Sequence, residues 1–237
     1  MIRRIYEKEE LYSALDKFKP DILRGKIKSL EESYGFKYPF LKFFVQTDLS
    51  SVIAVYYDSA VVLGRADEET ALFLETEFGG EVLTSAENEK IFGSFSYETL
   101  YIMEYTGIIS EKTALRTDLS YEKVYEILKE GFDIPFDEWY TDTCHRVRHG
   151  ISRIYTIEDK AAATEIFSVD GISLITLVAV KKAYRKSGLG GMLVKSLSEK
   201  LKEKGKVFVI CEKSLIPFYE KNGYKLNETC IRINMMK

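Results

Sequence analysis

Apolar and polar positions along the chain of 237 residues form two successive rounds of helix-like and strand-like patterns. Helices are expected where apolar residues recur every three to four positions, and strands where short apolar runs are bounded by turn residues. In the first round, two helices come before three strands, a third helix and two further strands. The ranges predicted for these elements, in chain order, are 7–18, 22–34, 40–46, 52–57, 60–63, 67–78, 81–84 and 97–105.

The second round repeats this order after a short opening strand. Its predicted ranges are 113–116, 120–131, 137–149, 151–157, 160–167, 172–180, 188–205, 207–211 and 228–235. The repeated order predicts two halves, residues 1–110 and 111–237, of which the first is a degenerate duplicate of the second. An unrelated α+β first domain is the alternative. The fold class is α/β (α+β), with a mixed, mostly antiparallel central sheet flanked by helices.

A turn with two glycines separates the strand ending at Val180 from the next helix. Gly188 and Gly190 allow the backbone to approach a ligand closely because they have no Cβ. The first amides of a helix lack intrahelical partners and carry a partial positive charge, so they suit phosphate groups. This geometry predicts an anion site, although an ordinary strand–helix–strand unit with a glycine turn has the same pattern.

The charge around this turn differs from that of the whole chain. Residues 181–206 contain nine lysines or arginines and two glutamates, whereas the formal net charge of the protein is −3. A locally basic segment in an acidic chain favours a discrete anionic ligand over a nucleic-acid surface.

The residues of the turn, Arg185-Lys186-Ser187-Gly188-Leu189-Gly190, resemble the Arg/Gln-x-x-Gly-x-Gly/Ala turn of the GNAT superfamily of N-acetyltransferases. Val180 and Tyr184 also match the approach to that turn. A looser second signature is found at Ser214, Pro217 and residues 218–224. The resemblance covers about residues 112–237, and its two signatures occur at the separation typical of the family.

The resemblance implies that the protein is an acetyl-CoA-dependent N-acetyltransferase acting on a primary amine of a small molecule or peptide. Lys182, Lys186 and Ser214 depart from the family pattern, and Ser214 puts the usual contact with the pantetheine arm in doubt. The residues expected to bind coenzyme A are Val178, Ala179, Val180, Arg185, Lys186, Ser187, Gly188, Leu189, Gly190 and Ser214.

Tyr219 occupies the position of the family's general acid, where a phenol can protonate the departing thiolate. A core tyrosine is the structural alternative. The candidates for the general base are Glu158, Asp159, Glu165 and Glu212. Glu212 is preferred because it directly follows a central strand. By the family's arrangement, the acceptor pocket is expected to be lined by aromatic side chains, which could also be core: Phe132, Phe136, Trp139, Tyr140 and Tyr155.

The corresponding turn of the first half, residues 64–69, contains Asp67, Glu68 and Glu69. Three carboxylates in a first helical turn satisfy the helix dipole and repel a diphosphate. The first half is therefore expected not to bind coenzyme A. Its expected roles are packing, shaping the acceptor cleft or contact in a homodimer.

Three widely spaced cysteines, Cys144, Cys211 and Cys230, favour neither a disulfide framework nor a cysteine zinc site. His145 and His149 lie four residues apart, but they lack the accompanying ligands of a zinc motif, so no metal is expected. The N-terminal residues lack the apolar segment of a signal peptide, and no run is long enough to span a bilayer. A cytoplasmic location, with neither membrane nor nucleic-acid partners, is expected.

Two other functions compete with acetyl transfer. One is a non-catalytic module that binds acyl-CoA in a regulatory role. The other is an aminoacyl transferase, which tandem versions of the fold resemble. An RNA-borne donor calls for a broadly basic face, and the acidic total counts against it.

Overall fold

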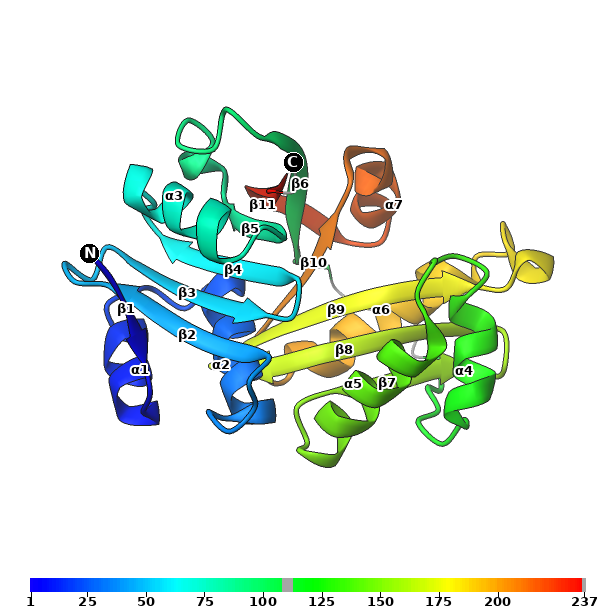
Figure 1. Ribbon diagram of the computed structural model, residues 1–237. Helices are drawn as coiled ribbons and strands as arrows, with labels where there is room; N and C mark the ends of the chain where they lie inside the picture. Colours follow the sequence, from blue (N-terminus) through cyan, green and yellow to red (C-terminus); the bar gives the residue numbers. More distant parts are fainter. Residues whose placement is uncertain (108–112, 236–237) are drawn as a thin grey trace. The chain divides into compact units, whose positions relative to one another are not determined.

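The computed structural model describes residues 1–107 and 113–235 and divides the chain into two compact units (Figure 1). One unit comprises Met1–Ile102 with Glu228–Lys237, and the other comprises Met103–Asn227. The predicted boundary between residues 110 and 111 lies outside the described residues. The division into residues 1–110 and 111–237 therefore stays a prediction.

The first unit opens with a strand that the sequence patterns did not indicate. β1 contains Arg3 and Arg4, which are exposed, and only Ile5 is fully buried, so it lacks the apolar run of a central strand. The elements of this unit are β1 (Ile2–Ile5), α1 (Lys8–Leu15), α2 (Ile22–Tyr34), β2 (Leu41–Gln46), β3 (Ser51–Tyr56), β4 (Ser59–Gly64), α3 (Glu68–Glu77), β5 (Glu81–Ser85), β6 (Ser96–Tyr105) and β11 (Tyr224–Asn234). β6 and β11 each contain a point where the chain passes between units.

The strand order in this unit is β1-β2-β3-β4-β5-β11. β1 to β4 form an antiparallel meander, β5 pairs in parallel with β4, and β11 pairs antiparallel with β5. The parallel pair requires a crossover, and α3 provides it. The sheet is thus mixed and mostly antiparallel, as predicted.

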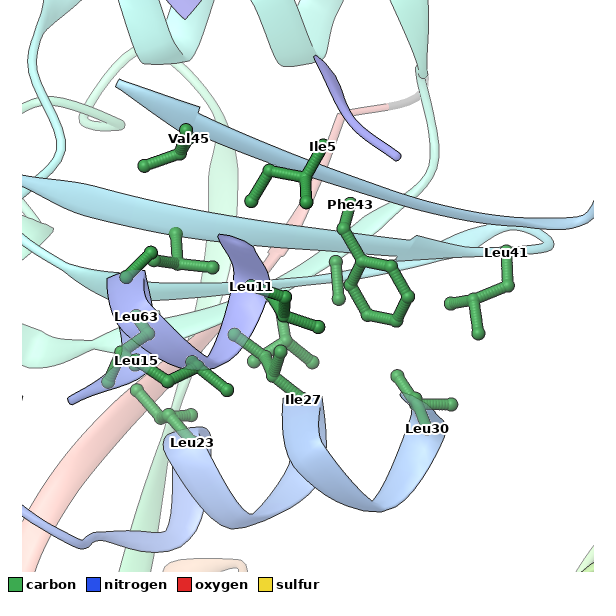
Figure 2. Packing of buried hydrophobic residues seen from close by; sticks show 14 of the residues in the cluster. Ile5, Leu11, Leu15, Leu23, Ile27, Leu30, Leu41, Phe43, Val45 and Leu63 are labelled. Carbon is green, nitrogen blue, oxygen red and sulfur yellow. The ribbon is translucent and has the colours of Figure 1, made fainter. Parts of the chain in front are cut away.

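α1 and α2 cover one face of this sheet because their apolar residues recur at helical spacing. Leu11 and Leu15 of α1 meet Leu23, Ile27 and Leu30 of α2 beneath the strands (Figure 2). Full burial of one such side chain contributes about 1.5–3 kcal/mol. The strand residues of this cluster that Figure 2 labels are Ile5, Leu41, Phe43, Val45 and Leu63. Alternate residues, including Ile53 and Val62, join a second core on the opposite face with Leu74 of α3.

The second unit repeats this order of elements. It contains α4 (Tyr121–Leu128), α5 (Phe136–Arg148), β7 (Arg153–Ile157), β8 (Ala161–Val169), β9 (Ile172–Val180), α6 (Leu189–Lys202), β10 (Lys206–Cys211) and α7 (Ile216–Lys221). The strand predicted over 113–116 is wrong, because the structure has only an isolated bridge there, between Arg116 and Thr156. Ser120 precedes α4 as predicted, but its side chain makes no capping hydrogen bond within the described residues.

β7, β8 and β9 form an antiparallel meander, and β10 pairs in parallel with β9. α6 makes the crossover, as α3 does in the first unit. α4 and α5 pack against one face of these strands through Val124, Ile127 and Trp139. Buried Leu193, Leu197 and Leu201 of α6 share one helix face. The common order in the two units confirms the prediction of two tandem halves with the same fold.

Among the described residues, no helix combines the length and the apolar character needed to cross a membrane.

Candidate coenzyme-binding and catalytic site

The first turn of α6 is open to a ligand. Gly188 is its N-cap residue, with φ of 88°, and no side chain caps the helix within the described residues. Nothing lies within 4 Å of where a Cβ on Gly188 would be, so the space above the turn is free. Lys186, at φ of 65°, also adopts the left-handed conformation. The amides that begin α6 are therefore available as donors to an anion.

The turn is held by its own side chains. Arg185 donates from Nε to the carbonyl oxygen of Val180 at 3.0 Å, and from a terminal nitrogen to that of Glu130 at 2.7 Å. Ser187 donates from Oγ to the carbonyl oxygen of Tyr184 at 2.6 Å. The side chains of Arg185 and Ser187 thus donate hydrogen bonds to backbone carbonyl oxygens around the turn, whereas the side chain of Lys186 is exposed to solvent.

A cavity of 820 Å³ opens beside this turn within the second unit. It lies against α6 and the end of α7. Its lining residues are Tyr105, Gly107, Thr113, Val180, Tyr184, Arg185, Lys186, Gly188, Leu189, Gly190, Gly191, Met192, Lys195, Ser196, Phe218, Glu220, Lys221, Asn222 and Gly223. Four cationic side chains and one carboxylate are among these described residues, so the cavity favours an anionic ligand.

Next to the cavity, β9 and β10 separate. Their parallel pairing ends at Ile175 and Val209 in the described part of the chain, although β9 continues to Val180 and β10 to Cys211. A register shift against β8 occurs in the same part of β9, where Leu177 has φ of 51°. This bulge leaves the backbone of residues 178–180 beside the end of β10 that no longer pairs with β9.

Tyr219 lies on α7, where its side chain is 7% exposed and its ring packs against Phe218 and Tyr224. Burial raises the pKa of the Tyr219 phenol, and the neighbouring Cys211 thiol raises it further. Burial likewise raises the pKa of Cys211 to about 11, with a further contribution from the charge of Glu212. At neutral pH both groups are protonated, and the phenol lies near the end of β10.

Glu212 and Ser214 are both exposed. Glu212 comes just before a short 3₁₀ helix, Lys213–Leu215, and Ser214 lies within it. Neither of these described residues lines the cavity, whereas Phe218 does. Their predicted roles as base and as coenzyme contact stay predictions.

Four of the five aromatic residues predicted for an acceptor pocket lie together. Phe136 contacts Trp139, with 6.2 Å between ring centroids, and stacks on Tyr140 at 5.4 Å. Phe132 joins the same group against α4 and β9. These side chains form one aromatic cluster around the start of α5.

Tyr155 does not join this aromatic cluster. Successive strand residues point to opposite faces, and its neighbour Ile154 faces α4 and α5. Tyr155 is fully buried, donates to the Glu165 carboxylate at 3.0 Å, and lies under Lys200 of α6. Glu165, a predicted alternative base, also pairs with Lys204 at 2.9 Å. Both residues therefore belong to the α6 side of the strands.

The corresponding turn of the first unit, residues 64–69 before α3, is capped by side chains of the protein. The Asp67 carboxylate accepts from the Thr70 amide at 2.8 Å and so caps α3. The Asn88 side chain accepts from the Ala66 amide at 2.9 Å and donates to the Gly64 carbonyl oxygen at 2.9 Å. Asp67 was part of the sequence argument, whereas the contribution of Asn88 was missed because it lies 22 residues from Ala66.

His145 and His149 stack with 4.3 Å between ring centroids, and one nitrogen of His149 contacts the carbonyl oxygen of His145 at 2.9 Å. No group of three potential metal ligands occurs among the described residues.

Several cavity residues were missed from the sequence, namely Tyr105, Met192, Lys195, Lys221 and Asn222. Lys195 had a recognisable signal, since it follows Gly188 by seven residues and so shares its helix face. Lys221 and Asn222 lie within the second signature, residues 218–224, although no ligand contact was assigned to them. Tyr105 had no signal, because only the fold brings it to α6.

Residues 147–226 match the family described as acetyltransferase (GNAT) domain. No protein in the curated set matches the chain significantly. Similar solved structures include a Drosophila protein, with a TM-score of 0.67, 12% identity and 98% coverage of both chains. An acetyltransferase from the GNAT family of Colwellia psychrerythraea has a TM-score of 0.61, 9% identity and 98% coverage of both chains.

A tandem GNAT protein from the clavulanic acid biosynthesis pathway aligns with 98% of this chain and 97% of its own. Its TM-score is 0.64 at 10% identity, a level at which the likeness concerns the fold. Its two-half arrangement agrees with the repeated order of elements found here. Residues 147–226 therefore match a GNAT acetyltransferase domain, and the fold of the chain resembles that of tandem GNAT structures over nearly its full length.

Proposed function

We propose that the protein is an acetyl-CoA-dependent N-acetyltransferase that acts on a primary amine of a small molecule or peptide. The observation that carries this proposal is the uncapped start of α6, which opens onto a cationic cavity beside the separated ends of β9 and β10. A helix start suits a diphosphate, and unpaired strand backbone suits the amide-containing arm of coenzyme A.

The residues proposed to hold acetyl-CoA divide into two groups. The amides of Gly188, Leu189 and Gly190 would bind the diphosphate, with Lys186 contributing charge. The backbone of residues 178–180 would pair with the pantetheine arm. Acetyl-CoA supplies the acetyl group as a thioester, and the separation of the strands leaves room for an extended ligand without breaking an existing ladder.

Proton transfer is assigned to two side chains. In the reaction a C–N bond forms and the C–S bond breaks; the amine loses one proton and the leaving thiolate gains one. Tyr219, held protonated by burial, would donate its phenolic proton to the sulfur. Glu212, exposed and adjacent to Cys211, is the proposed acceptor of the amine proton, directly or through water. The aromatic cluster of Phe132, Phe136, Trp139 and Tyr140 is proposed to contact the acceptor.

The proposal is tested by measuring release of free coenzyme A thiol from acetyl-CoA over a panel of primary amines. We expect amine-dependent release that Gly188→Asp abolishes, because the new carboxylate repels the diphosphate. Gly150→Asp is the matched control, since Gly150 also has a positive φ and open space but lies after α5. Binding of acetyl-CoA without thiol release for any amine would identify a binding module instead. Absence of binding would reject the site altogether.

A further inference from the structure

The cavity continues beyond the turn that would take a diphosphate. It extends along α6 to Lys195 and Ser196, and its opposite wall is formed by residues 220–223 at the end of α7. Two cations of this extension, Lys195 and Lys221, come from different helices and converge on the same space. Neither belongs to the glycine turn.

Lys195 and Lys221 are exposed, and neither forms an ion pair with any described residue. Some other lysines of this unit are paired; Lys204, for example, binds Glu165 at 2.9 Å and Lys181 binds Asp159 at 3.4 Å. The carboxylate among the described lining residues, Glu220, is exposed, so solvent screens its charge. The extension therefore has two cationic groups that form no ion pair within the described residues.

The geometry of α6 sets the distance between the two anion-binding regions. Gly188 and Lys195 are seven residues apart, which places them on one helix face about 10 Å apart along the axis. Helical side chains lean towards the N-terminus, so the Lys195 ammonium lies closer to the turn than its own Cα. A second anionic group on the same ligand, roughly one sugar ring from the first, fits this separation.

We infer that Lys195 and Lys221 bind the 3′-phosphate of coenzyme A and select it over 3′-dephospho-coenzyme A. The inference rests on the proposed function, because it assumes that the diphosphate occupies the start of α6. Coenzyme A carries this second phosphate on its ribose, on the far side of the sugar from the diphosphate. Two lysines without counterions complement its double charge, whereas the amides of α6 are already assigned to the diphosphate.

The alternative is that both lysines only strengthen binding of the diphosphate. Coenzyme A and 3′-dephospho-coenzyme A have the same diphosphate, so lysines that contact only the diphosphate would increase the affinity for both ligands equally. Lysines that contact the 3′-phosphate would increase the affinity for coenzyme A alone. Each exposed charge pair contributes only modestly to the free energy of binding. We therefore expect the two lysines together to favour coenzyme A over 3′-dephospho-coenzyme A by about tenfold in affinity.

The experiment is isothermal titration calorimetry of the full chain with coenzyme A and with 3′-dephospho-coenzyme A. The wild type should bind coenzyme A about tenfold more tightly, and Lys195→Gln/Lys221→Gln should remove that preference while leaving the dissociation constant for 3′-dephospho-coenzyme A unchanged. Lys200→Gln/Lys225→Gln is the matched control, because it removes the same charge from exposed positions of the same unit outside the cavity lining. This control should keep the preference.

Each contrary result has a distinct meaning. Equal affinity of the wild type for both ligands overturns the inference and leaves the proposed function standing. A loss of affinity for both ligands in Lys195→Gln/Lys221→Gln assigns the lysines to the diphosphate and also overturns it. Binding of neither ligand by the wild type rejects the proposed function together with the inference. Circular dichroism of the variants confirms that they fold.

Discussion

The side chain of Arg185 is bonded to the strand that precedes it, with Nε donating at 3.0 Å to the carbonyl oxygen of Val180. Val180 is the last residue of β9 and lines the cavity. A second bond from the guanidinium reaches the carbonyl oxygen of Glu130 at 2.7 Å. Arg185 therefore fixes the shape of the glycine turn, because its planar guanidinium can donate several hydrogen bonds at once, which no other side chain can do in the same geometry.

Arg185→Lys should consequently weaken coenzyme A binding, although it keeps the charge. A lysine ammonium cannot reproduce both bonds, so the turn loses order, and we expect affinity to fall about tenfold, corresponding to one or two lost hydrogen bonds. Calorimetry with coenzyme A measures this change. Lys186→Gln is the control for charge alone; if it costs more affinity than Arg185→Lys, the positioning role of Arg185 is wrong.

Tyr219→Phe should lower the rate of acetyl transfer at least tenfold and leave coenzyme A binding intact. The change removes the proton donor but keeps the ring that packs between Phe218 and Tyr224. Steady-state thiol release and calorimetry together separate the two effects. Tyr224→Phe makes a similar change to a buried ring that bonds Ser198, and an equal loss of rate in that variant would mean that Tyr219 acts only through packing.

The three cysteines should differ in reactivity. Burial raises the pKa of both Cys211 and Cys230 to about 11, from 9.0. The thiolate is the reactive form of cysteine. A pKa that is higher by about two lowers the thiolate fraction at pH 8 roughly a hundredfold. Cys144 is partly exposed. A thiol reagent at pH 8 should therefore modify Cys144 first in the native protein and all three cysteines in denaturant. Equal native rates would contradict the burial of Cys211 and Cys230.

The chain should bind one molecule of coenzyme A rather than two. In the first unit, the Asp67 carboxylate accepts from the Thr70 amide and the Asn88 side chain accepts from the Ala66 amide, so two backbone donors of the site equivalent to the α6 turn are already used. The carboxylates of Asp67, Glu68 and Glu69 add repulsion against a diphosphate. Calorimetric stoichiometry measures this directly. Arg65→Asp, a charge reversal on an exposed residue of that turn, should leave both stoichiometry and affinity unchanged. A stoichiometry of two would show that the first unit binds as well.

The local elements were largely predictable because their signals are local. α2 begins and ends at the predicted residues, since Asp21 caps it, with its carboxylate accepting from the Arg24 amide at 2.7 Å, and Gly35 follows it at φ of 61°. The glycine turn was predictable for the same reason, as φ of 88° at Gly188 favours the residue found there. β1 was missed because pairing with β2, and not its own apolar content, makes it a strand.

The composition of the site was less predictable. Strand alternation separates Tyr155 from the aromatic cluster, and the face of the sheet that it occupies depends on the packing of α6. Tyr105 reaches the cavity wall by bonding Glu199, 94 residues away, at 2.6 Å. Such contacts carry no pattern in the sequence, because no local preference of either residue selects the other.

By itself, the sequence determined the order of helices and strands, the repeated halves and the glycine turn before α6. Each of these follows from preferences that act over a few neighbouring residues, such as apolar spacing, helix caps and positive φ at glycine. Only the tertiary structure decided which charges face the cavity, which side chains hold the turn and that Asn88 helps to close its counterpart in the first unit. Those outcomes depend on residues brought together across many positions, where packing and pairing of whole elements choose the partners.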